Sequence, residues 1–172
     1  MLNALLYHCS SLSSFSNRPG VIHRLDKETS GVIVFAKTDK AHYFISEQFA
    51  NREILKQYKA IVWGNLNKEQ LIEKYLKRDD KNRLRFKTSD STGKKSITVC
   101  KRVKNYSIAI SIVDAYPKTG RTHQIRVHLA SKKLPIIGDR AYNPSSKIAK
   151  DTPEKLIKVI RDIPRQALHS RK

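Results

Sequence analysis

Four candidate β-strands follow one another in residues 71–113, whose sequence reads LIEKYLKRDDKNRLRFKTSDSTGKKSITVCKRVKNYSIAISIV. Apolar and β-branched residues gather in four runs, at 71–76, 84–86, 97–103 and 108–113. Between the first three runs lie Asp79-Asp80-Lys81-Asn82 and Ser91-Thr92-Gly93, which are typical of turns. Strands joined by short turns pair in antiparallel fashion. The stretch therefore predicts a β-meander.

The flanking sequence predicts few helices and a few more strands. Strands are expected at 21–22, 31–35 and 54–63, the last with Tyr58, Ala60 and Val62 on one side. Helices are expected at 2–8, after the cap signal Thr38-Asp39, at 122–131, and from the cap Thr152-Pro153-Glu154 to just before Pro164. This pattern predicts an α+β fold, a mainly antiparallel mixed sheet flanked by a few helices. We expect one domain over residues 1–172.

The charge balance points to a polyanionic partner. The chain has 35 Lys and Arg against 15 Asp and Glu, a net charge of +20, and its 39% hydrophobic residues are too many for a disordered basic tail. An excess of this size on a folded domain is typical of nucleic-acid binding. A solvated Lys-rich surface is the alternative.

Other classes of protein find less support in the sequence. No apolar run approaches the roughly 20 residues of a membrane-spanning helix, and the first residues do not resemble a signal peptide. We expect a cytoplasmic protein without a membrane partner. Cys9 and Cys100 are expected to be two buried thiols, with a disulfide left open. His123 and His128 are spaced i, i+5, which disfavours a zinc pair, so no metal is predicted.

Two polar stretches are candidates for chemistry. Residues 23–31 place His23, Arg24, Asp26 and neighbouring polar groups after a predicted strand, where a scaffold displays reactive groups. On local sequence alone, a charged β-turn whose ions pair with each other is the favoured interpretation. In the second stretch, residues 119–128, Arg121 falls at a predicted helix start. The helix macrodipole disfavours a cation there, so Arg121 should face a carboxylate or phosphate unless it is a plain surface arginine.

Five ordered blocks resemble the RluA-like family of RNA pseudouridine synthases. They are His23-Arg24-Leu25-Asp26 with Thr29-Ser30-Gly31, Ala36-Lys37-Thr38, Lys56-Gln57-Tyr58-Lys59-Ala60, residues 120–130, and Pro135-Ile136-Ile137-Gly138-Asp139. The resemblance extends over residues 4–169. Compared with the family pattern, a first strand is missing and the final strand is short. We therefore expect a catalytic domain that is incomplete at both termini.

The resemblance also implies roles for particular residues. Asp26 is implied as the catalytic carboxylate, Arg121 as its charge partner, and Tyr58 as the aromatic residue against the target base. Without the resemblance, the sequence pattern predicts that Tyr58 is an ordinary core residue on a strand. Four residues are implied to contact RNA: Arg24, His23, Arg126 and His123.

The implied activity is isomerisation of uridine to pseudouridine in structured RNA. The reaction breaks the N1–C1′ bond, turns the base and joins C5 to C1′, so no cofactor is expected. Large-subunit ribosomal RNA is the expected partner, with tRNA as a further possibility and no obligate protein partner. The alternatives are a catalytically inactive RNA-binding remnant of the same fold and, with less support, a basic ribosome-associated structural protein.

Overall fold

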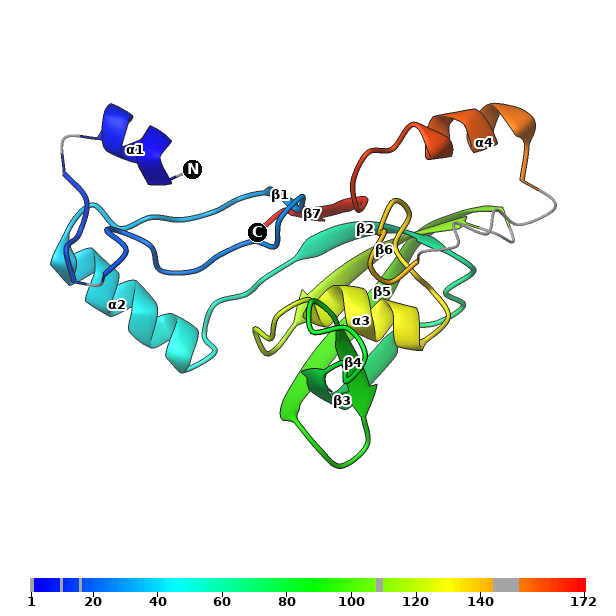
Figure 1. Cartoon of the computed structure of the whole chain (residues 1–172), viewed down its shortest axis with the longest axis horizontal. Helices are drawn as coiled ribbons and strands as arrows, with labels where there is room; N and C mark the ends of the chain where they lie inside the picture. The colour runs from blue at the N-terminus through cyan, green and yellow to red at the C-terminus, as the bar shows by residue number, and fades with distance from the viewer. Residues whose placement is uncertain (1, 10, 16, 108–109, 144–151) are drawn as a thin grey trace. The chain divides into compact units, whose positions relative to one another are not determined.

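The computed structural model describes residues 2–9, 11–15, 17–107, 110–143 and 152–172 (Figure 1). Its internal contacts divide the chain into two compact units. One comprises residues 1–25 with 32–55, and the other comprises residues 26–31 with 56–172. The single domain expected over residues 1–172 stays a prediction. No helix in the described part of the chain is long and apolar enough to cross a membrane.

The second unit holds a mixed sheet of seven described strands. They are β1 (Ser30–Gly31), β2 (Tyr58–Trp63), β3 (Gln70–Arg78), β4 (Phe86–Ser89), β5 (Lys94–Ser107), β6 (Ile110–Pro117) and β7 (Leu168–Ser170). Their order across the sheet is β1-β7-β2-β6-β5-β3-β4. The β1–β7 pair is parallel and the other pairs are antiparallel. The predicted α+β fold with a mainly antiparallel mixed sheet is confirmed.

The predicted meander corresponds to β3 to β6, with longer strands than the sequence indicated. The first two residues of the run predicted at 108–113 lie outside the described residues. In β2, Ala60 pairs with Val113 of β6 and is fully buried, as is Val62 two residues on. Tyr58 packs against the same core cluster. This is the alternation expected of a strand with one face on a core.

One helix of the second unit covers this core. Ile125 and Leu129 of α3 (Gln124–Ser131) are buried in the same hydrophobic cluster as Ala60 and Val113. Figure 1 shows α3 lying over the strands. A second helix, α4 (Glu154–Arg161), packs Leu156 and Ile160 against a smaller cluster that includes Trp63, Ile110 and Ile137.

The start of α4 differs from the expected cap. Pro153 occupies the N-cap position, where it has no side-chain hydrogen-bonding group, and the helix begins at Glu154. Thr152 therefore lies one residue too early to cap it, and its buried Oγ1 has no hydrogen-bond partner among the described residues. The helix does end before Pro164, as expected.

The first unit contains α1 (Leu2–His8) and α2 (Asp39–Ala50). Thr38 caps α2, and its Oγ1 accepts a hydrogen bond from Ala41 N at 3.2 Å, as predicted. Asp39 Oδ1 in the first turn accepts from Ser13 Oγ at 2.6 Å and from Ser14 N at 2.9 Å. These bonds, that from Ser13 first, lower the pKa of the Asp39 carboxyl. They fasten the segment before α2 to the helix N-terminus.

The strands predicted at 21–22 and 31–35 are wrong. Within the described residues, Val21 and Phe35 form one isolated antiparallel bridge, and the nearby strand β1 covers Ser30–Gly31. Val32 and Val34 are 50% and 41% exposed. β-branched residues favour extended backbone, but a strand needs a ladder of partners along its length. The amino-acid composition of these two runs does not determine whether such hydrogen-bond partners are present.

The two cysteines differ in burial. Cys100 on β5 is buried, and burial raises the pKa of its thiol to about 12. Cys9 is only half-buried, so the expectation of two buried thiols is wrong for Cys9. Both thiols are free.

Candidate active site

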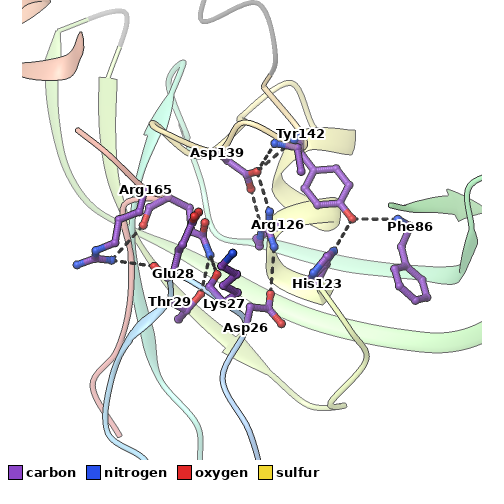
Figure 2. A network of polar contacts seen from close by, with 12 residues as sticks. Asp26, Lys27, Glu28, Thr29, Phe86, His123, Arg126, Asp139, Tyr142 and Arg165 are labelled. Atoms are coloured by element: carbon purple, nitrogen blue, oxygen red, sulfur yellow. Dashed lines mark hydrogen bonds and ion pairs between the residues drawn. The ribbon is translucent and has the colours of Figure 1, made fainter. Parts of the chain in front are cut away.

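The turn that carries Asp26 is fastened to the segment that precedes β7. Thr29 N donates to Asp26 O at 3.0 Å, and Glu28 adopts φ +71°. The side-chain amide of Gln166, which is 1% exposed, donates to Lys27 O at 2.7 Å and to Thr29 Oγ1 at 3.0 Å. Arg165 Nη1 donates to Glu28 O at 3.1 Å (Figure 2). The side chains of Arg165 and Gln166 therefore fix the backbone of the turn that carries Asp26.

Directly after this turn the chain passes very close to β7. Gly31 pairs with Ser170 in the parallel ladder and adopts φ +124°. A Cβ at this position would lie 2.1 Å from Ser170 O. Glycine is therefore required here, both for the backbone conformation and for the close approach.

The side-chain amide of Gln124 fixes the start of α3. Its Oε1 accepts from Thr119 Oγ1 at 2.7 Å and from Arg121 N at 3.0 Å. Its Nε2 donates to Ile97 O and to Thr98 Oγ1, both at 2.9 Å. Four bonds from one buried amide tie the loop before α3 to β5, which positions the residues that α3 presents.

His128 continues this network one turn further along α3. Ser96 Oγ donates to Lys74 O at 2.6 Å, so its oxygen accepts from His128 Nε2 at 2.8 Å. Thr98 Oγ1 accepts from Gln124 and lies 2.9 Å from His128 Nδ1. A neutral ring with its proton on Nε2 satisfies both contacts, since Nε2 then donates to Ser96 and Nδ1 accepts from Thr98. Burial lowers the pKa of His128 to about 4, which agrees with a neutral ring.

Arg126 of α3 contacts two carboxylates. Its Nε and Nη2 donate to Oδ2 and Oδ1 of Asp139 at 2.7 and 2.9 Å, and its Nη1 lies 3.4 Å from Oδ2 of Asp26. Figure 2 shows the guanidinium between the two acids. Burial by itself lowers the pKa of Arg126, but the hydrogen bonds and charge of Asp139, together with the charge of Asp26, outweigh it and raise that pKa. Arg126 is therefore a fixed cation beside Asp26.

The predicted pair between Arg121 and Asp26 is wrong. Arg121 Nε donates to the carbonyl of Lys95 at 3.3 Å, and the ion pair of Asp26 in the described residues is with Arg126. Arg121 precedes α3, whereas Arg126 lies in its first turn on the side that faces the turn of Asp26. Both arginines belong to one short block, so the residue types alone did not distinguish them.

Tyr58 lies at the first position of β2, on the face that packs on the core. Burial raises the pKa of its hydroxyl, a hydrogen bond with Ser170 lowers it, and the charge of Asp26 raises it further. The negative charge of Asp26 is therefore close enough to act on the phenol. The structure brings three of the predicted residues, Asp26, Tyr58 and Arg126, into one neighbourhood.

His123 contacts the same neighbourhood from the N-cap position of α3, where it adopts φ +55°. Its Nδ1 lies 2.8 Å from the hydroxyl of Tyr142, and its ring packs edge-on against Phe86 and Tyr142. Tyr142 covers Arg126, with the guanidinium carbon 5.0 Å from the ring centroid. The RNA contact implied for His123 stays a prediction.

His23 and Arg24 belong to the first unit. His23 Nε2 accepts from Val34 N at 3.0 Å, and its ring stacks on Phe49 with the centroids 5.0 Å apart. Both residues line an open groove of about 480 Å³, together with Asn17, Arg18, Val21 and Ile22. The structure thus places His23 in a structural contact, and its predicted RNA contact, like that of Arg24, stays untested.

Neither Asp139 nor Tyr142 was predicted from the sequence to be a site residue. Asp139 is 1% exposed and Tyr142 is half-buried. An acidic residue directly after Gly138 in an otherwise apolar block was the available signal, because a buried carboxylate requires a partner. Among the described residues, no group of three or more His, Cys, Asp or Glu side chains is arranged to hold a metal ion.

Comparison with known proteins places the chain in a family. Residues 5–131 match the family model described as RNA pseudouridylate synthase, and the chain belongs to this family. It is 40% identical over 170 residues to the ribosomal large subunit pseudouridine synthase D of Xylella fastidiosa, covering 99% of this chain and 50% of that protein. The enzyme of the same name from Borreliella burgdorferi is 43% identical over 147 residues, 83% of this chain and 45% of that protein.

The fold agrees with this assignment. The solved structure of human RNA pseudouridylate synthase domain containing 1 superposes with a TM-score of 0.74 at 26% identity, over 96% of this chain and 64% of that chain. The resemblance to the RluA-like synthases is confirmed at the level of the family. The chain spans about half the length of the curated relatives it matches.

Proposed function

We propose that this protein is an RNA pseudouridine synthase, an isomerase that converts uridine to pseudouridine in structured RNA. The observation that carries the proposal is the carboxylate of Asp26 held beside the buried guanidinium of Arg126, whose remaining hydrogen bonds go to Asp139. Membership of the RNA pseudouridylate synthase family supports the reaction class.

The chemistry needs one ionised carboxylate that acts as nucleophile or base. Uracil leaves C1′ with the electron pair of the N1–C1′ bond, turns, and forms a bond from C5 to C1′. The hydrogen on C5 is then removed and N1 gains one, so the product is an isomer of the substrate. Arg126 places a positive charge 3.4 Å from the carboxylate of Asp26.

The substrate base must leave its stack, which costs a few kcal/mol. Tyr58, whose hydroxyl pKa is raised in part by the charge of Asp26, is the aromatic side chain that we propose packs against the displaced base. The net charge of +20 supplies phosphate contacts, which position an RNA without selecting the uridine. Large-subunit ribosomal RNA is the proposed substrate, since the relatives from Xylella and Borreliella are named ribosomal large subunit pseudouridine synthase D. We propose that the protein acts in the cytoplasm on this ribosomal RNA.

The test is to map pseudouridines in total RNA from cells with and without the gene, and from cells that express Asp26→Asn. The proposal expects one or more sites in large-subunit ribosomal RNA to disappear in the deletion and in Asp26→Asn. Glu28→Gln, which removes a charge from the same turn, is the matched control and should retain the sites. Unchanged maps in the deletion, with intact RNA binding by the purified chain, would favour the catalytically inactive remnant. Sites lost from tRNA alone would contradict the ribosomal substrate.

A further inference from the structure

Arg126 is held far more tightly by Asp139 than by Asp26. The guanidinium meets Asp139 with two short bonds, 2.7 and 2.9 Å, in the fork geometry that favours Arg–carboxylate pairs. Its single contact with Asp26 is 3.4 Å long. The side chains of Asp139 and Arg126 are 0% and 8% exposed, whereas that of Asp26 is 24% exposed. One carboxylate is therefore a permanent partner, and the other remains accessible.

Asp139 is itself fixed and has little freedom to follow a moving arginine. Its Oδ1 also accepts from the backbone N–H groups of Ala141 and Tyr142, at 3.0 and 3.1 Å. Its own N–H donates to Ile136 O at 3.2 Å. The carboxylate thus closes a tight turn while it holds the guanidinium, and Figure 2 shows both sets of bonds.

The aromatic ring of Tyr142 limits Arg126 on a further side. The ring lies over the guanidinium, and its hydroxyl oxygen accepts from Phe86 N at 2.9 Å and contacts His123 Nδ1 at 2.8 Å. Nε and Nη2 of Arg126 are bound to Asp139, and Tyr142 covers one face of the guanidinium. Nη1 is therefore the nitrogen that remains to contact Asp26.

We propose that Asp139 is a positioning residue. It orients the guanidinium of Arg126 so that only Nη1 donates to Asp26. This inference rests on the proposed function, because it takes Asp26 as the reacting carboxylate. With Asp139 in place, Arg126 supplies a positive charge next to Asp26 but does not enclose its oxygens in a fork. Without Asp139, the fork is free to turn onto Asp26 or to leave the site, and either movement removes the productive geometry.

The first experiment measures catalysis with the full chain and an RNA that the wild-type protein modifies. For Asp139→Asn we expect kcat to fall about 100-fold, the loss typical of a misplaced catalytic group. KM and RNA affinity should stay within about threefold of wild type. Asp114→Asn is the matched control: it removes a carboxylate paired with Lys59 at 3.0 Å elsewhere in the sheet and should leave kcat unchanged.

A double-variant cycle tests whether Asp139 acts through Arg126. In an Arg126→Met background, adding Asp139→Asn should lower kcat by no more than about threefold, since the group it orients is already gone. A further fall in kcat of about 100-fold in that background overturns the inference. If Asp139→Asn melts below the assay temperature, Asp139→Glu keeps the charge, displaces the fork and should show the same loss of kcat.

The second experiment does not depend on activity. The Nε–H signal of Arg126 in an NMR spectrum, identified by its absence in Arg126→Lys, reports whether the fork is held. Its hydrogen exchange should be slow in the wild-type protein and at least about 10-fold faster in Asp139→Asn. Unchanged exchange, or unchanged kcat in a wild-type protein that forms pseudouridine, overturns the positioning role alone. Failure of the wild-type protein to form pseudouridine overturns the proposed function and this inference with it.

Discussion

Asp26 and Arg126 lie 100 residues apart in the chain, yet Oδ2 of the carboxylate is 3.4 Å from Nη1 of the guanidinium. The contact joins the turn before β1 to the first turn of α3, and each side is held by its own hydrogen bonds. Gln166 fixes the turn, and Gln124 fixes the start of the helix. The distance between the two groups is therefore set by two separately anchored backbones.

The choice between the two arginines gives the most direct prediction. Arg126→Lys keeps the charge but cannot reproduce the fork on Asp139, so kcat should fall about 100-fold. Arg121→Lys loses one exposed hydrogen bond to Lys95 O, whose net value of about 1 kcal/mol corresponds to a change below about 10-fold. Single-turnover rates on one RNA measure both. A larger loss in Arg121→Lys than in Arg126→Lys would return the charge-partner role to Arg121.

Tyr58 is expected to act through its ring. Tyr58→Leu fills much of the same core space but removes the aromatic face, and stacking on a base contributes about 1–3 kcal/mol, so kcat/KM should fall about 10- to 100-fold. Tyr58→Phe loses only the hydrogen bond with Ser170, and kcat/KM should fall no more than about fivefold. Equal losses in the two variants would show that the hydroxyl, rather than the ring, is what the reaction needs.

Gly31 should tolerate no side chain. Gly31→Ala forces a Cβ to within 2.1 Å of Ser170 O at φ +124°, so the free energy of unfolding should fall by more than about 1 kcal/mol. Activity should fall with it, because β1 follows the turn of Asp26. Gly120→Ala is the matched control, since the nearest neighbour of its Cβ is the flexible Lys56 Nζ at 3.9 Å. Urea unfolding compares the two, and equal stability of both variants would contradict the close approach at Gly31.

His128 should make folding sensitive to mild acid. Its pKa is about 4 in the folded protein against 6.5 in an exposed ring, so between these values the unfolded chain binds more protons and stability falls as the pH falls. The loss from this group reaches about 3 kcal/mol by pH 4. His128→Gln cannot titrate, so the stability difference between wild type and variant should shrink from pH 6.5 to pH 4. A constant difference across that range in urea unfolding would contradict the buried neutral ring.

RNA affinity should depend steeply on salt. The chain carries a net charge of +20, and each phosphate contact releases counterions, giving a slope of about −0.7 per contact for single strands in a plot of log affinity against log salt. Titrations of a labelled RNA over a series of salt concentrations measure the slope. A nearly flat dependence would support the alternative, that the charge is only a solvated surface.

The amino-acid sequence by itself determined the features that depend on near neighbours. The Thr38 cap of α2, the alternation that turns Tyr58 and Ala60 to one side of β2, and the succession of strands in the meander were all readable, because each depends on residues a few positions apart. The blocks resembling RluA-like synthases identified the family, and they predict Asp26 as the catalytic carboxylate. The strands predicted at 21–22 and 31–35 were wrong, because a strand also depends on partners that lie elsewhere in the chain.

The tertiary structure alone decided which groups meet around Asp26. The parallel pairing of β1 with β7 joins Ser30 to His169, and no local pattern encodes a pairing across that separation. In the same way, Arg126 rather than Arg121 reaches Asp26, and Asp139 becomes a buried partner. These choices follow from how α3 packs on the sheet and which side of the helix then faces the turn. Propensity and periodicity describe a segment, whereas the contacts of a site depend on how separate segments pack together.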